Sequence, residues 1–192
     1  MIIVRTIDAL RAAASSWRRA GKTVALIPTM GALHEGHLSL LRLGQTICDQ
    51  TIVTIFINPS QFGKNEDLES YPSNLTQDTE ILKTVGADLL FTPDNQEMYP
   101  TGFSTVVFPG PVSKTLCGTV RPGHFEGVAT VVTKLLMQSQ PDKAIFGEKD
   151  YQQLFVIRKI SSDLDIPVEI ISAPTKRASD GLALSSRNAY LS

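Results

Sequence analysis

The 192-residue sequence lacks several features that would assign it to a functional class at once. It has no run of about 18 uncharged apolar residues, which a membrane-spanning helix needs. Its apolar start is interrupted by Arg5 and Asp8 before the core of a secretory signal can form. With 18 basic and 19 acidic residues, it lacks the basic excess typical of nucleic-acid-binding proteins. We therefore expect neither a membrane nor a nucleic acid among its partners.

Cysteine is scarce, and the common nucleotide-binding signatures are missing. Cys48 and Cys117 lie far apart in no metal-binding pattern, so we expect reduced thiols in a cytoplasmic protein and no structural zinc. Residues 21–23 (Gly-Lys-Thr) resemble the end of a P-loop, but position 16 is serine and a strand is predicted after them instead of before. No Gly-x-Gly-x-x-Gly motif is present. If the chain binds a nucleotide, it therefore does so through neither a P-loop nor a dinucleotide-binding glycine motif.

The chain does contain a regular alternation of helical and strand-like segments. This alternation predicts βαβ units, and hence an α/β fold with a Rossmann-like, doubly wound parallel sheet that carries helices on both faces. The proline-rich stretch 95–124 fits less well, and we expect it to be irregular with one strand at 104–108. Helices are expected at 7–19, 36–49, 76–85, 126–139 and 151–164, and strands at 23–27, 51–57, 88–92, 144–146 and 167–171.

Polar, loop-forming segments follow the predicted strands. They occupy 28–37, 58–62 and 147–150, with 184–188 beyond the last strand. In doubly wound sheets the carboxyl ends of the strands share one edge, and ligands bind there. We therefore expect these four segments to form one site.

Two of the three histidines, His34 and His37, stand at the mouth of a predicted helix. Their spacing places both rings on one face of that helix. Gly31 and Gly36 leave room for phosphates, and the helix N-terminus offers unpaired N–H groups. This combination predicts phosphate binding. Exposed capping histidines and a metal site are the alternatives, although the spacing is not that of zinc peptidases.

Cationic side chains accompany this predicted phosphate site. Lys149 and Arg187 lie on the same edge and could stabilise the charge that develops on phosphate oxygens during phosphoryl or nucleotidyl transfer. Each alone is more often a solvated charge, and it is their joint occurrence at one edge that favours the functional interpretation. Arg121 precedes Pro122 and Gly123, and is either a mobile cation or simply part of a turn.

Three neutral amides, Asn58, Gln61 and Gln153, lie near the same edge. They could orient the hydroxyl and carboxylate groups of a small acid without cancelling the charge of an attacking carboxylate. They could equally cap turns, which is common for an asparagine that precedes proline.

Taken together, the motifs resemble those of a known family. Residues 28–37 are similar to the His-x-Gly-His nucleotide site of the nucleotidyltransferase superfamily. More narrowly, the sequence resembles the pantothenate synthetase (pantoate–β-alanine ligase) family. Counterparts of that family's motifs follow in order at 56–62, 121–125, 147–153 and 184–188, so the resemblance covers nearly the whole chain.

This resemblance implies a two-step ligase reaction. The carboxylate of pantoate attacks the α-phosphate of ATP to give pantoyl adenylate and pyrophosphate. The amine of β-alanine then attacks the acyl carbon and releases AMP and pantothenate. The resemblance also implies Mg²⁺ with the ATP and a cytoplasmic homodimer. Catalytic roles are implied for His34, His37, Lys149 and Arg187, with His37 the candidate proton donor.

The same resemblance implies the remaining site residues. Segment 185–187 is similar to the mobile Lys-Met-Ser-Lys-Ser loop of class I aminoacyl-tRNA synthetases. Substrate contacts are implied for Gln61, Gln153, Asn58 and Arg121, and a possible Mg²⁺ contact for Asp78. The implied ATP-binding residues are Met30, Gly31, Ala32, Leu33, His34, Glu35, Gly36, His37, Gly147, Glu148, Lys149, Asp150, Lys176, Leu184, Ser185, Ser186 and Arg187.

Alternatives to this function remain open. Another nucleotidyltransferase, such as a cytidylyl- or phosphopantetheine adenylyl-transferase, and a non-catalytic nucleotide-binding module both fit the motifs. A tRNA-synthetase fragment that binds RNA is disfavoured by the net charge of −1. Family members carry a smaller C-terminal domain that closes over the site. We expect 1–192 to be one N-terminal ATP- and pantoate-binding domain without that lid, which binds ATP but forms the adenylate slowly or loses it to water.

Overall fold

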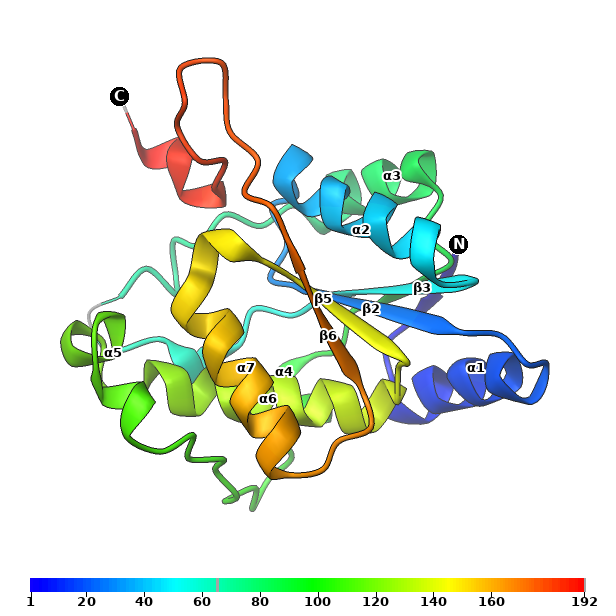
Figure 1. Ribbon diagram of the computed structural model, residues 1–192, viewed down its shortest axis with the longest axis horizontal. Helices are drawn as coiled ribbons and strands as arrows, with labels where there is room; N and C mark the ends of the chain where they lie inside the picture. The colour runs from blue at the N-terminus through cyan, green and yellow to red at the C-terminus, as the bar shows by residue number, and fades with distance from the viewer. Residues whose placement is uncertain (65, 192) are drawn as a thin grey trace.

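The computed structural model describes residues 1–64 and 66–191, and its centre is a six-stranded sheet (Figure 1). The strand order is β1-β4-β3-β2-β5-β6, and every neighbouring pair is parallel. The predicted α/β class and parallel sheet are confirmed. The strands are β1 (Ile2–Val4), β2 (Val24–Thr29), β3 (Gln50–Ile55), β4 (Leu89–Phe91), β5 (Lys143–Gly147) and β6 (Glu169–Ala173).

Helices connect these strands close to where the sequence predicts them. The first helix begins because the Thr6 side chain accepts a hydrogen bond from the N–H of Ala9, and its bounds match the predicted ones. Within the described part of the chain, no helix combines the length and apolarity needed to cross a membrane. The helices are α1 (Ile7–Arg19), α2 (Glu35–Ile47), α3 (Leu75–Val85), α4 (Asn95–Met98), α5 (Cys117–Val120), α6 (His124–Ser139) and α7 (Tyr151–Asp163), with 3-10 turns η1 (Pro59–Gln61), η2 (Pro111–Lys114), η3 (Glu148–Asp150) and η4 (Ser186–Tyr190).

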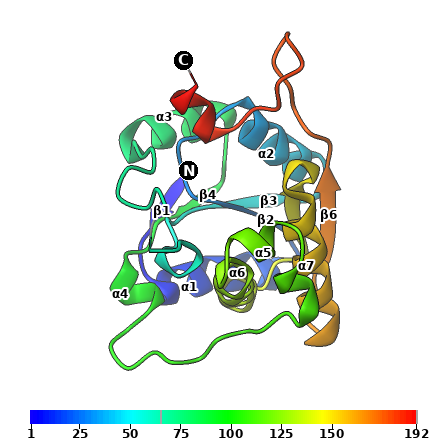
Figure 2. The same cartoon turned by 90° about the vertical axis from the view of Figure 1, so that its left-hand side faces the viewer.

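Side chains of the central strands alternate between two buried layers. In β2, Val24 and Leu26 pack in the layer of α1, α6 and α7, whereas Ala25 and Ile27 pack in the layer of α2 and α3. Figure 2 shows α2 and α3 above the sheet and α1 and α6 below it. Because both faces are covered, the strands are continuously apolar instead of alternating in polarity.

The sheet has a switch point beside β2. The chain adds β3 and then β4 on one side of β2, and afterwards crosses over to add β5 and β6 on the other side. In open α/β sheets the crevice at such a reversal, outside the carboxyl ends of the strands, is where ligands bind. The segments that follow β2 and β5 are therefore the ones best placed to form a site.

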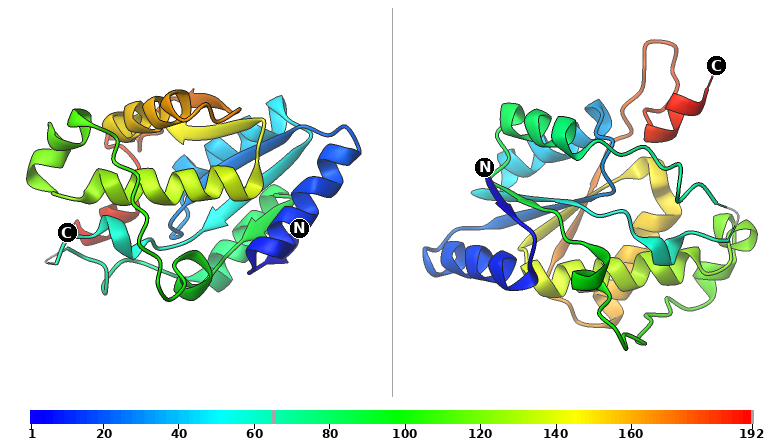
Figure 3. Two further views of the ribbon diagram at one scale, coloured as in Figure 1. Left: turned by 90° about the horizontal axis from the view of Figure 1, so that it is seen from below. Right: turned by 180° about the vertical axis from the view of Figure 1, so that it is seen from behind.

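Two features of the fold differ from the sequence-based prediction. Strand β1 was not predicted, because three residues at the edge of the sheet leave almost no pattern. The strand predicted at 104–108 is wrong. This stretch is an extended loop across the outside of α6 (Figure 3, left). Val106 and Phe108 are exposed, and the N–H of Val107 donates to the hydroxyl of Thr130 instead of to a neighbouring strand.

Candidate active site

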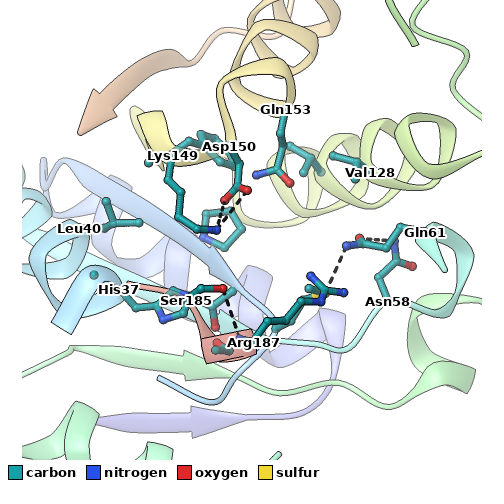
Figure 4. Close-up of a pocket in the computed structure, with 18 of the residues that line it drawn as sticks. His37, Leu40, Asn58, Gln61, Val128, Lys149, Asp150, Gln153, Ser185 and Arg187 are labelled. Carbon is teal, nitrogen blue, oxygen red and sulfur yellow. Dashed lines mark hydrogen bonds and ion pairs between the residues drawn. The ribbon is translucent and has the colours of Figure 1, made fainter. Parts of the chain in front are cut away.

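A cavity opens at the switch point, between the carboxyl ends of β2 and β5. The start of α2, the start of α7, one side of α6 and the returning chain from 174 to 187 complete its wall. Figure 4 shows Lys149 and Gln153 on one side of this cavity, with His37 and Arg187 on the opposite side. The four polar segments that follow the strands therefore do meet at one place.

Most of the predicted site residues line this single cavity. The predicted Gly31, Ala32, Leu33, Glu35 and Glu148 do not line it, and all of them except Ala32 are next to a residue that does. The predicted residues that line it are Met30, His34, Gly36, His37, Asn58, Gln61, Arg121, Gly147, Lys149, Asp150, Gln153, Lys176, Leu184, Ser185, Ser186 and Arg187.

The turn between β2 and α2 is held in place by a buried carboxylate. Gly31 and Ala32 both adopt positive φ, +85° and +48°. This conformation directs the N–H groups of Ala32 and Leu33 to the two oxygens of Asp78, at 2.9 and 2.8 Å. A side chain at position 31 would begin 3.0 Å from Asp78 Oδ2, which explains the glycine. Asp78 thus holds the shape of the turn between β2 and α2.

This arrangement argues against the predicted Mg²⁺ contact at Asp78. Both carboxylate oxygens already accept backbone hydrogen bonds, and the residue is only 3% exposed. Asp78 also does not line the main cavity. Among the described residues, no group of three or more His, Cys, Asp or Glu side chains is placed to hold a metal ion. In the described structure, Asp78 therefore serves as an anchor of the turn before α2.

The two histidines close the first turn of α2 and thereby acquire a defined tautomer. His34 Nδ1 accepts a hydrogen bond from the N–H of Gly36 at 3.1 Å, and His37 Nδ1 accepts one from the N–H of His34 at 3.3 Å. A ring nitrogen that accepts from an N–H carries no proton, so in the neutral ring the proton sits on Nε2. Both rings therefore carry a free Nε2–H donor, and their centroids lie 4.1 Å apart.

The surroundings of the pair favour the neutral form of both rings. Desolvation by the protein, followed by the charges of His34 and Lys149, lowers the pKa of His37 to about 3. Desolvation and Lys149 also lower the pKa of His34. Two neutral N–H donors suit hydrogen bonding to phosphate oxygens. They do not match the imidazolium that a proton-donating role for His37 would need near neutral pH.

We expect the free energy of unfolding to fall as the pH is lowered from 7 to 5. The pKa values of His34, His37 and His124 are all lowered in the folded chain, whereas unfolded histidines titrate near 6.5. The unfolded state therefore takes up protons in this window and is favoured. His37 alone should contribute about 2 kcal/mol, since one pKa unit is worth about 1.4 kcal/mol.

Urea unfolding at successive pH values measures this effect. The window from pH 7 to 5 lies above the usual titration range of carboxylates, so it reports mainly on the histidines. A His37→Gln variant should lose part of the pH dependence. A free energy of unfolding that stays constant across the window would contradict the neutral state assigned to the pair.

Gln61, the last residue of η1, and Asn58, which caps η1, both line the cavity (Figure 4). Asn58 Nδ2 donates to Gln61 Oε1 at 2.9 Å and to the carbonyl of Gly127 in α6 at 3.2 Å. Gln61 Nε2 lies 3.2 Å from the sulfur of Met30. The two amides are thus tied to α6 on one side and to the end of β2 on the other.

Arg121 is anchored at the cavity wall by two neighbours. Its guanidinium donates from Nε and Nη2 to both oxygens of Glu66, each at 2.6 Å, and these bonds lower the pKa of the Glu66 carboxyl. Its Nη1 donates to His124 Nε2 at 3.1 Å, because arginine can only donate. His124 Nδ1 then donates to the carbonyl of Gln61 at 2.9 Å. A neutral His124 therefore connects Arg121 to the backbone of η1.

Arg187 is held in a similar way across the cavity. Its Nε and Nη2 donate to the two oxygens of Asp67 at 2.9 and 2.8 Å. The guanidinium also lies 5.5 Å from the centre of the Tyr71 ring. The adjacent Ser186 hydroxyl donates to the carbonyl of Ala32, which joins η4 to the turn before α2. The sequence indicated a mobile cation or a turn for Arg121 and a charge partner of phosphate oxygens for Arg187. In the structure both guanidinium groups are paired with acids of one short segment, Glu66 and Asp67.

Several residues of the cavity wall were not among the predicted site residues, and three groups of them are informative. Tyr71 comes from a stretch without helical or strand periodicity, so no pattern marked it. His124 lies in the family motif at 121–125, but no spacing or neighbouring residue in the sequence indicates that its ring reaches the cavity. The third is an apolar side of α6, whose helical spacing was indistinguishable from that of an ordinary core face: Val128, Val131, Val132 and Leu135.

Comparisons with known proteins agree on one family. The family model described as pantoate–β-alanine ligase matches residues 2–192. The protein named pantothenate synthetase from Caulobacter vibrioides is 60% identical over 191 residues, which cover 100% of this chain and 67% of that protein. The protein of the same name from Paramagnetospirillum magneticum is 59% identical over 189 residues, covering 98% of this chain and 66% of that protein. The chain thus spans about two thirds of the length of these relatives.

Solved structures of similar proteins have the same fold. Pantothenate synthetase from Thermus thermophilus is 50% identical, with a TM-score of 0.95, and the match covers 100% of this chain and 68% of that one. Pantoate–β-alanine ligase from Francisella tularensis, solved with a β,γ-ATP compound and β-alanine, is 41% identical, with a TM-score of 0.96 over 100% of this chain and 74% of that one. The chain therefore belongs to the pantoate–β-alanine ligase family.

Proposed function

We propose that this chain carries the site at which a pantothenate synthetase joins pantoate to β-alanine at the expense of ATP. The observation that carries the proposal is the arrangement of the cavity. Two neutral imidazole N–H donors, from His34 and His37 at a helix N-terminus, line one part of the cavity. The amides of Gln61 and Gln153 line another part of the same cavity. The first set suits a triphosphate, and the second suits a small hydroxy acid.

The phosphate half of the site is built from His34, His37, Lys149 and the start of α2. The Nε2–H groups donate to phosphate oxygens, and the positive end of the helix dipole adds to the attraction. Lys149 contributes a full positive charge from η3, with its Nζ 3.4 Å from Asp150. When the carboxylate oxygen bonds to the α-phosphorus and the bond to pyrophosphate breaks, these donors stabilise the charge on the departing phosphate oxygens.

The acid half of the site is built from Gln61 and Gln153. Their neutral amides hold pantoate by hydrogen bonds and leave its carboxylate nucleophilic, whereas a cation at the same place would reduce its reactivity. The apolar side of α6, including Val128 and Val132, faces the same cavity and suits the hydrocarbon part of the acid. In the second step the β-alanine nitrogen bonds to the acyl carbon, loses a proton, and displaces AMP.

Mg²⁺ belongs to this proposal as a companion of ATP. The described residues contain no cluster of three metal-ligating side chains, so we infer that the ion enters with the phosphates and meets at most one or two protein carboxylates. Asp150 is the carboxylate at the cavity wall that is best placed for such a contact. The ion would supply charge neutralisation for the triphosphate.

Pantoate-dependent exchange of labelled pyrophosphate into ATP tests the proposal. The exchange requires reversible formation of the acyl adenylate, so it should appear with pantoate and be absent without it. Another nucleotidyltransferase would need a different acceptor, and a non-catalytic module would bind ATP in a calorimeter without any exchange. Either of those results would overturn the proposed activity.

We also propose a cytoplasmic homodimer, as the family resemblance implies. The free thiols of Cys48 and Cys117 support a reducing compartment. Val106, Phe108 and Leu116 are exposed apolar side chains that a second copy of the chain would cover in such a dimer. Sedimentation equilibrium of the purified chain distinguishes a dimer from a monomer.

A further inference from the structure

A relay of hydrogen bonds runs from the Tyr99 side chain through that of Asn58 to that of Gln61 at the cavity. Tyr99 is the residue that follows α4, and its hydroxyl donates a hydrogen bond to Asn58 Oδ1 at 2.7 Å. Asn58 Nδ2 in turn donates to Gln61 Oε1 at 2.9 Å. Asn58 and Gln61 are only 1% and 8% exposed, so solvent offers them few other partners. Tyr99 itself does not line the cavity, and nothing in the sequence motifs marks it.

The direction of every hydrogen bond in this relay is fixed by its neighbours. The Gly127 carbonyl lies 3.2 Å from Asn58 Nδ2 and can only accept, so the NH₂ group of Asn58 is on that side. The oxygen of Asn58 consequently faces Tyr99 and also accepts from the hydroxyl of Ser60 at 2.9 Å. Gln61 must then accept through Oε1, and its NH₂ group is left to face the cavity.

The hydroxyl of Tyr99 can be removed without moving its ring. The ring packs against Phe103 at 5.1 Å and Phe56 at 6.0 Å between centroids, and these contacts do not involve the oxygen. Burial raises the pKa of Tyr99, so the hydroxyl keeps the proton that it donates. Phenylalanine at this position therefore deletes the hydrogen bond to Asn58 and the longer, 3.3 Å contact with the Ser60 hydroxyl, and leaves the ring packing in place.

We propose that Tyr99 is a positioning residue that holds the Gln61 amide with its N–H donors toward the cavity, so that this wall selects an oxygen acceptor of the acid substrate. The proposal rests on the proposed function, because it assigns the acceptor to pantoate. A rotated Gln61 amide would present its oxygen to the oxygens of the acid, which is repulsive. Tyr99 thus acts on substrate recognition through Asn58, from outside the site.

The test compares Tyr99→Phe with the wild-type chain in the exchange reaction. We expect KM for pantoate to rise about three- to tenfold, the effect of one lost hydrogen bond, while kcat and KM for ATP change less than twofold. Tyr151→Phe is the matched control, since the Tyr151 side chain is exposed on α7 and should leave all three values unchanged. In an Asn58→Ala background the Tyr99 substitution should have no further effect, because the relay is already broken.

A second measurement does not depend on activity. In ¹⁵N–¹H spectra the side-chain amide resonances of Asn58 and Gln61 should shift in Tyr99→Phe and stay in place in Tyr151→Phe. Unshifted resonances, or an unchanged KM for pantoate, would overturn the positioning role. Equal losses for ATP and pantoate would also overturn it, since they indicate a general structural change. A wild-type chain without exchange but with the expected shifts would instead count against the proposed function alone.

Discussion

Replacement of His37 by alanine is expected to lower kcat for the exchange reaction by about a hundredfold to a thousandfold, the usual cost of one preorganised donor to a developing negative charge. The His37 ring is desolvated, neutral and held by the N–H of His34, so its Nε2–H is fixed in place before ATP binds. Affinity for ATP should fall less than tenfold, because the helix terminus and Lys149 remain. Steady-state kinetics and calorimetric titration with ATP separate the two quantities.

The controls for this variant follow from its second role as a cap of α2. Loss of the cap should cost about 1 kcal/mol of folding free energy, which urea unfolding measures separately. His37→Gln retains an N–H donor and should recover part of kcat. Arg42→Ala, which removes an exposed ion pair with Glu35 on the same helix, should leave both kcat and ATP affinity unchanged. If kcat and ATP affinity instead fell together by one factor in His37→Ala, the donor would not be specific to the transition state.

The sequence predicted the sheet and the position of the site because both depend on strong, local signals. A threonine cap and a following glycine bounded α1 correctly. Buried runs such as that of β3 are apolar on both faces, and parallel strands bring the segments that follow them to one edge. The segments after β2 and β5 therefore converge on the cavity, as predicted.

The remaining details depend on long-range pairings that no local pattern encodes. The partner of Arg187 is Asp67, 120 positions away in the chain, and nothing in the residues around either indicates this pairing. Asp78 was predicted as a possible outer Mg²⁺ contact, whereas its hydrogen bonds with the N–H groups of Ala32 and Leu33 come from the way α3 packs beside the turn. The loop at 104–108 has strand-like residues, yet no free strand edge lies beside it in the described structure.

Gly127 illustrates how such a pairing can be essential while it remains invisible in the sequence. The residue lies inside α6, where glycine is intrinsically about 1 kcal/mol worse than alanine. A Cβ there would lie 2.3 Å from the carbonyl oxygen of Ser60 and 2.6 Å from the backbone nitrogen of Gln61. These are backbone atoms, which cannot rotate away. The glycine is thus required by the close contact between α6 and η1.

We therefore expect Gly127→Ala to destabilise the chain despite the better helix propensity of alanine. Overpacking against backbone costs about 1–3 kcal/mol or more, which exceeds the gain of about 1 kcal/mol. Because the clash displaces η1, which carries Asn58 and Gln61, pantoate affinity should fall at least tenfold, whereas ATP affinity should change little. Urea unfolding and separate titrations with ATP and pantoate measure these effects.

The matched control for this substitution is Gly63→Ala, where the added carbon would meet only the Glu66 side chain at an ordinary 3.7 Å. Its stability should stay within about 0.5 kcal/mol of the wild type. A Gly127→Ala chain that is more stable than the wild type would show that helix propensity dominates and that η1 can move at no cost. In that case the position of Gln61 would not depend on its contact with α6, and the acid half of the site would need a different structural support.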